Sequence, residues 1–150
     1  MSFGPEWQGS PGVGIIELRE AAYFPPAAVQ LLEWSLGEAE RVHGPEHGDT
    51  DELRRLLALV LQGRGRATEA LPLFERVVAR QERLQGASAP ETLAARYELA
   101  LALRHVGRSG RALVMLAGVV DDAAVALGAG HPLAVASRRL FAQLQRTEGC

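Results

Sequence analysis

Apolar residues recur along most of the chain at spacings of three and four residues, which is the period of one face of an α-helix. Residues 56–66 and 98–108 carry one such block, and residues 67–78 and 109–120 carry a second. Prolines, glycines and short polar stretches separate the blocks, as turns between helices do. The pattern predicts helices over residues 26–43, 50–63, 67–85, 91–106, 109–127 and 132–146.

Residue types at the predicted helix ends agree with these limits. Thr50 and Thr92, and the prolines at 90 and 132, stand where helices are expected to begin. Glycine is the residue most often found just past a helix C-terminus. Five glycines occupy such places: Gly44, Gly65, Gly86, Gly107 and Gly128.

The blocks form an internal repeat of 42 residues. The stretches "GPEHGDT", "GASAPET" and "GAGHPLA" begin at Gly44, Gly86 and Gly128. Apolar positions match at the same spacing, as in Leu57 and Leu99 or in Ala28, Ala70 and Ala112. A single helical hairpin cannot bury its apolar face, whereas stacked hairpins can. We therefore expect an all-α solenoid of antiparallel helix hairpins with about six to seven helices.

These repeats resemble tetratricopeptide repeats (TPRs). The resemblance rests on Leu-Ala pairs such as Leu57-Ala58, on a Gly-Arg turn, and on the "ALPLF" stretch at 70–74. The 42-residue period and the linker are similar to those of kinesin light chain repeats. The resemblance implies one TPR domain over 14–150 after a flexible tail over 1–13. Within it we expect a degenerate half-repeat (14–43), repeats at 44–85 and 86–127, and a closing helix (128–147).

Composition and charge exclude several classes of protein. The 150 residues are 47% hydrophobic and 23% charged, which is typical of a globular chain. The net charge of −2 argues against a nucleic-acid partner. No apolar run approaches the length of about 18 residues that a membrane span needs, and no signal peptide is recognisable, so we expect a cytoplasmic protein with no membrane partner. All 16 basic residues are arginine, which suggests a GC-rich bacterial genome.

No candidate chemistry indicates an enzyme. His43 and His47 are four residues apart, but Gly44 and Pro45 break the helix between them, and His131 recurs two periods after His47. This recurrence favours a structural role over metal binding. Cys150 is the only cysteine and has no predicted base beside it. We therefore expect no catalytic residues, no metal and no cofactor.

The TPR resemblance places a partner-binding groove on the first helix of each repeat. The residues carried over to that groove are Arg55, Leu59, Gln62, Tyr97, Leu101, Arg104, His105, Arg139, Gln143 and Arg146. This set holds four arginines and no carboxylate, and arginine pairs well with carboxylate or phosphate. The alternative is that arginine is simply the only cation this chain uses on exposed helices. Kinesin-light-chain-like repeats often clamp peptides with asparagine, and this chain has none.

A second column of arginines, Arg54, Arg96 and Arg138, follows the same period. We expect their stems to pack on the apolar seam between helices, with the heads reaching a carboxylate such as Glu33 or Glu75. The alternative is that the column extends the positive groove.

The last predicted helix has no following partner helix. It either caps the solenoid or leaves its apolar side open to a second copy of the chain. The contact residues for such a homodimer would be Leu133, Leu140, Phe141 and Leu144.

Taken together, the sequence predicts a non-catalytic interaction scaffold or adaptor that holds an acidic peptide or protein surface in an arginine-lined concave groove. The alternative function is a regulatory or sensor subunit that binds a small ligand or signalling peptide and modulates a partner. Fold alone does not identify the partner.

Overall fold

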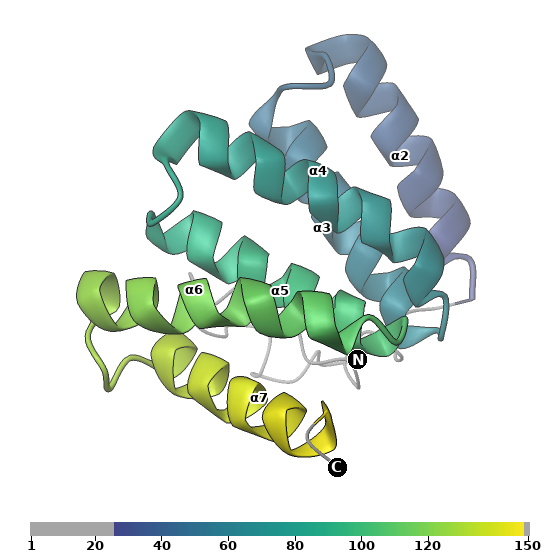
Figure 1. Cartoon of the computed structure of the whole chain (residues 1–150). Coiled ribbons are helices and arrows are strands. Elements are labelled where there is room, and N and C mark those ends of the chain that lie inside the picture. Colours follow the sequence, from purple (N-terminus) through teal and green to yellow (C-terminus); the bar gives the residue numbers. More distant parts are fainter. Residues whose placement is uncertain (1–25, 149–150) are drawn as a thin grey trace, which may run out of the picture.

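The computed structural model describes residues 26–148, which form a stack of helical hairpins (Figure 1). The described helices are α2 (Ala28–His43), α3 (Gly48–Gly63), α4 (Ala67–Gln85), α5 (Pro90–His105), α6 (Ser109–Leu127) and α7 (Pro132–Glu148). Each predicted helix is present with ends within two residues of the prediction, and the all-α solenoid is confirmed. The expected tail over 1–13, the start of the half-repeat (residues 14–25) and Cys150 lie outside the described residues.

Each helix packs chiefly against the helix before it and the helix after it in the chain. Figure 1 shows the result as a succession of antiparallel helices from α2 to α7. This is the arrangement expected when every hairpin buries its apolar face against its neighbours.

The turns inside the two complete hairpins have the same backbone conformation and the same pair of backbone hydrogen bonds. Gly65 and Gly107 have φ values of 78° and 82°, in the left-handed region that favours glycine. In the first turn, the N–H of Arg66 donates to the carbonyl of Leu61 at 2.8 Å, and the N–H of Gly65 donates to Gln62 at 3.1 Å. This pair of bonds is the Schellman motif, which closes a helix with glycine. All five glycines predicted at helix ends have positive φ.

A histidine immediately precedes two of the helices, α3 and α7. The Nδ1 atom of His47 accepts a hydrogen bond of 3.1 Å from the N–H of Asp49 at the start of α3. The Nδ1 atom of His131 accepts an equivalent bond of 3.1 Å from Leu133 at the start of α7. Both histidines thus satisfy a backbone donor that the helix leaves unpaired. This position accounts for their recurrence at twice the period.

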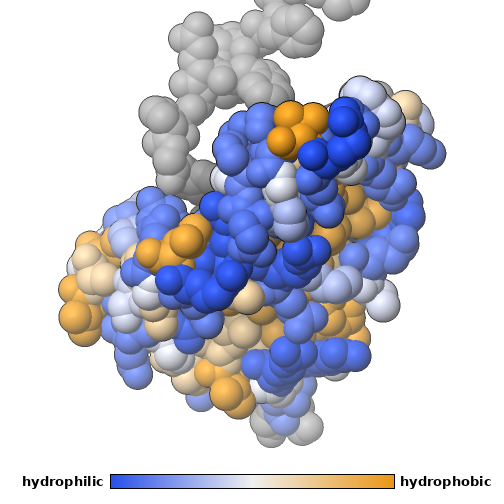
Figure 2. All heavy atoms as spheres, turned by 90° about the horizontal axis from the view of Figure 1, so that it is seen from above, coloured by the Kyte–Doolittle hydropathy of each residue, from blue (hydrophilic) through white to orange (hydrophobic). Residues whose placement is uncertain are grey.

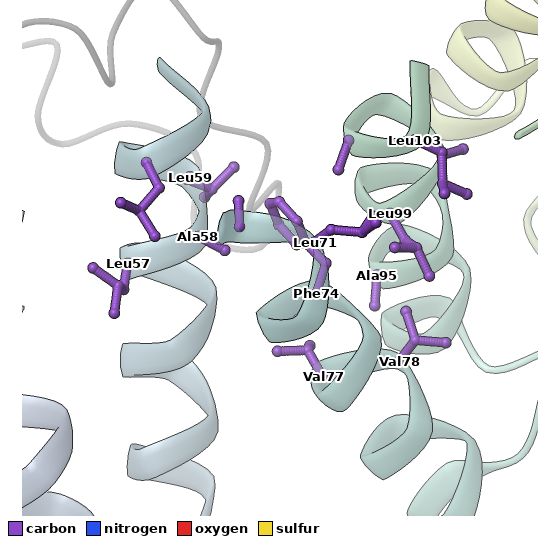
Figure 3. Packing of buried hydrophobic residues seen from close by; sticks show 14 of the residues in the cluster. Leu57, Ala58, Leu59, Leu71, Phe74, Val77, Val78, Ala95, Leu99 and Leu103 are labelled. Carbon is purple, nitrogen blue, oxygen red and sulfur yellow. The ribbon is translucent and has the colours of Figure 1, made fainter. Parts of the chain in front are cut away.

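The core consists of a large cluster with residues from α2 to α7 and a smaller cluster between α5, α6 and α7. In Figure 3, Leu71 and Phe74 of α4 lie between side chains of α3, such as Ala58, and side chains of α5, such as Leu99. Phe74 is 1% exposed, and Leu116, its equivalent one period later, is fully buried. The second helix of one repeat therefore fills the space between two successive first helices.

The arginine column at positions 54, 96 and 138 stabilises the loops between hairpins. Arg54 donates to the carbonyl of Pro45 at 2.7 Å, and Arg138 donates to that of Ala129 at 2.9 Å. Arg96 makes the same contact with Ala87 at 3.3 Å. The expected packing of the stems holds for Arg54, which is 2% exposed. Two of the heads also lie beside a carboxylate as expected, Arg54 at 3.7 Å from Asp51 and Arg96 at 3.5 Å from Asp122, but these carboxylates are not Glu33 or Glu75. The acceptor that all three arginines share is the loop carbonyl nine residues earlier, because the loop folds back over the first turns of the following helix.

The outer surface is largely polar. Figure 2 shows a face on which hydrophilic side chains predominate and apolar ones form separate spots. Six large apolar side chains are exposed in the described residues: Leu31, Trp34, Val42, Leu84, Val114 and Val125. None of the helices from α2 to α7 combines the length and the apolar character needed to cross a membrane.

Candidate functional site

A cavity of about 510 Å³ lies where α5 and α7 end, and we call it the basic cavity. Arg104 and Arg146 occur one period apart, so they stand at the same place on successive first helices. Gln143 joins them from the preceding turn of α7. The full lining is Arg104, Ser109, Gln143, Leu144, Arg146, Thr147 and Glu148. Three of the predicted groove residues are thus brought together at one site.

The basic cavity has a positive electrostatic environment. His105 is exposed overall, but the partial burial of its ring lowers its pKa, and the neighbouring charge of Arg104 lowers this pKa further. Burial raises the pKa of the Tyr97 hydroxyl, and Arg104 opposes that shift. Helix α6 begins here and α5 and α7 end here, so the helix ends supply partial charges of both signs, and Glu148 adds a carboxylate to the lining. Arg104 and Arg146 are the positive charges of the lining, and Glu148 is its one negative charge.

Arg55 is held in an ion pair with a carboxylate from the next repeat. Its Nε and Nη2 atoms donate to the two oxygens of Glu98 at 2.8 and 2.9 Å, and its Nη1 donates to Glu52 at 3.3 Å. The side chains of Arg55 and Glu98 are 15% and 4% exposed. Burial raises the pKa of Glu98, while Arg55 opposes that shift. The charge of Arg55 is therefore neutralised within the chain.

Glu98 is the functional neighbour that the sequence analysis missed. The predicted groove holds four arginines and no carboxylate, whereas the structure places Glu98 directly against the first of them, Arg55. Glu98 follows Arg55 by 43 residues, one more than the repeat period. A search for opposite charges at the period plus one residue would have found this pair, because stacked repeats bring such positions together.

The other predicted groove residues differ in accessibility. Leu59 and Gln62 are buried, at 4% and 6% exposure. Tyr97 and Leu101 are half-buried and pack against the core. Arg139 and His105 are exposed on α7 and α5. Only part of the predicted set is therefore accessible to a partner.

The apolar side of α7 packs within its own chain. Leu133, Leu140 and Leu144 are 3–5% exposed, and Phe141 is half-buried against the core. Helix α7 thus covers the end of the solenoid. Of the four residues suggested for a homodimer, Phe141 keeps the most accessible surface.

We expect Glu98→Gln to lower the free energy of unfolding by about 2 kcal/mol, because two charge-assisted hydrogen bonds between repeats lose their anionic acceptor. The matched control is Glu52→Gln, which removes the exposed carboxylate that touches the same arginine and should cost less than about 0.5 kcal/mol. Urea denaturation followed by circular dichroism measures both. Equal losses in the two variants would contradict the role given to Glu98.

Comparison with known proteins agrees with this architecture. The tetratricopeptide repeat family matches over residues 49–121. Among solved structures, the chain is similar to the TPR-like repeats of a kinesin light chain from Podosopora anserina, with 32% identity and a TM-score of 0.75. That match covers 81% of this chain and 58% of the other. A variant of the same repeats gives 31% identity and a TM-score of 0.76, covering 81% and 57%.

The chain thus spans little more than half the length of these solved relatives. No curated protein sequence matches it. The stacked helical hairpins are the feature that it shares with the matched repeats. Residues 49–121 therefore carry tetratricopeptide repeats, and the stacked hairpins are similar to the TPR-like repeats of a kinesin light chain.

Proposed function

We propose that this scaffold binds an acidic segment of a partner protein and that the basic cavity is the main anchoring point. The observation that supports the proposal is the convergence of Arg104, Gln143 and Arg146 around one cavity of about 510 Å³. A guanidinium group presents paired N–H donors that match the two oxygens of a carboxylate. The amide of Gln143 can add a neutral donor to the same oxygens.

Only the accessible residues of the predicted arginine-lined groove would contact the partner. Arg55 contributes little to an anion site because Glu98 already accepts two of its donors. Arg139 and His105 remain candidates for secondary contacts, since both are exposed on the helices that form the basic cavity. Tyr97 lies close enough to Arg104 for the charge to affect its hydroxyl, so it would flank a bound segment.

The test is a peptide-display selection with the unmodified chain and with the charge-reversed variant Arg104→Glu as targets. We expect the unmodified chain to enrich peptides rich in aspartate and glutamate, and Arg104→Glu to weaken binding of the enriched peptides about tenfold or more, because attraction becomes repulsion. The affinities are measured by fluorescence anisotropy.

The matched control is Arg76→Glu, which makes the same charge change at an exposed position on α4. It should leave the affinity for acidic peptides nearly unchanged. Selection of peptides without acidic residues, or equal weakening by both variants, would contradict the proposed function.

A further inference from the structure

A second cavity, of about 430 Å³, lies at the opposite ends of the same helices, where α3, α5 and α7 begin. We call it the acidic cavity. Much of its wall is apolar and comes from Val77 on α4, Ala94 and Ala95 on α5, and Leu133 on α7. Its lining also holds four carboxylates: Asp51, Glu52, Glu91 and Glu98.

The four carboxylates of the acidic cavity face three arginines, which leaves one negative charge in excess. Arg54 and Arg80 lie beside Asp51 at 3.7 and 3.4 Å, and Arg55 is paired within the lining. Arg55 is the only arginine in the lining, and it donates to Glu98 and Glu52. Asp51 and Glu98 are buried, with side chains 6% and 4% exposed, whereas Glu52 and Glu91 are exposed. Glu52 and Glu91 are therefore in contact with solvent at the cavity, whereas Asp51 and Glu98 lie in its interior wall.

Two buried acceptors in this lining have no hydrogen-bond donor among the described residues. These are Oδ1 of Asp51 and Oε1 of Gln81. The nearest cation to Oδ1 is Nη1 of Arg54 at 3.7 Å, beyond hydrogen-bond distance. The other oxygen of Asp51 accepts only long bonds of 3.4 Å, from Arg80 and Gln81. Buried acceptors are normally paired, so a donor is missing behind the wall of the cavity. The carboxylates that a ligand reaches from solvent are those of Glu52 and Glu91.

The shape and composition of the cavity favour an organic cation over a metal ion. Between residues 26 and 148, no three His, Cys, Asp or Glu side chains are grouped closely enough to hold a metal. The apolar wall suits an aliphatic stem, and the carboxylates suit the charged head that arginine and lysine carry on such a stem. We propose that the acidic cavity binds an arginine or lysine side chain of the partner segment.

The two cavities also define a spacing. Ala94 and Ala95 in the acidic cavity precede Arg104 in the basic cavity by nine or ten residues of α5, which corresponds to about 14 Å along the helix. Nine residues also turn α5 by about half a turn beyond two full turns, so a peptide that reaches both cavities needs more than the four or five extended residues that span the rise alone. If the proposed function holds, the bound segment carries a basic residue at least five positions from an acidic one.

The acidic cavity can be tested alone with butylguanidinium and butylammonium as probes. Each is titrated into the full chain while backbone amide shifts are followed by NMR. We expect shifts concentrated at Glu52, Glu91, Ala94 and Leu133, and a larger response to whichever cation matches the natural side chain. Butanol, which has the same stem without charge, should give much smaller shifts.

Charge removal at the exposed pair provides the second arm of the test. Glu52→Gln combined with Glu91→Gln should raise the Kd of the cation about three- to tenfold. The matched control removes two exposed carboxylates elsewhere, with Glu33→Gln and Glu82→Gln, and should change the Kd little. Equal effects of the two double variants, equal shifts with butanol, or shifts spread over all exposed carboxylates would each overturn the proposal.

Peptides separate this inference from the proposed function on which the spacing depends. In a peptide that carries both charges, replacing only the basic residue by glutamine tests the acidic cavity, and replacing only the acidic residue tests the basic cavity. A loss of binding confined to the first replacement would support the acidic cavity and contradict the proposed function. A loss confined to the second replacement would overturn the acidic cavity.

Discussion

Replacing Phe74 with alanine is expected to lower the free energy of unfolding by about 3–5 kcal/mol. The ring is 1% exposed and lies between α3 and α5 (Figure 3), so its loss leaves a cavity that borders two repeats. The remaining core relaxes only partly around such a cavity, and the lost contacts add to the lost transfer free energy. A single domain has about 5–15 kcal/mol of stability, so this change would remove a large share of it.

The matched control is Leu32→Ala, at the equivalent position one period earlier. Leu32 is only half-buried, because α2 packs chiefly against α3 among the described helices. Truncation of Leu32 should lower the free energy of unfolding by only about 1 kcal/mol, because folding removes less apolar surface from water at that site. Urea denaturation followed by circular dichroism compares the two. If both variants lose the same stability, the space between α3 and α5 is not the principal core.

Replacing Arg54 with methionine is the second change with a large expected effect, about 3 kcal/mol of destabilisation. The side chain is almost fully buried and donates to the carbonyl of Pro45 at 2.7 Å, with the carboxylate of Asp51 at 3.7 Å. Methionine fills a similar volume but supplies no donor and no charge. The buried carboxylate would then keep only the weaker contacts with Arg80 and Gln81.

Arg138→Met is the period-matched control for this prediction. Arg138 makes the same type of bond to its preceding loop, but it is exposed, so its loss should cost about 1 kcal/mol or less. Adding Asp51→Asn to Arg54→Met should restore part of the stability, because the uncompensated buried charge is removed. Thermal and urea unfolding measure all three. A double variant less stable than Arg54→Met would show that Asp51 is not the source of the cost.

Much of the fold was predictable from local sequence patterns. The apolar period sets each helix, glycine is required where φ is positive, and the 42-residue spacing sets the stacking, since each repeat buries its face against the next. His47 and His131 could be recognised as structural residues because they recur with the linker. These features depend on short-range backbone geometry, which the sequence encodes directly.

The candidate site was only partly predictable, and the arginines show why. Arg54, Arg55 and Arg104 are all arginines of predicted first helices, yet one is buried, one is paired and one lines a cavity. The burial and pairing of each guanidinium group depend on which carbonyl or carboxylate comes within about 3 Å of it when the repeats stack. The sequence alone determined a TPR solenoid and the places where charge could gather. Only the tertiary structure decided which charges are cancelled, because contacts between repeats join residues about one period apart.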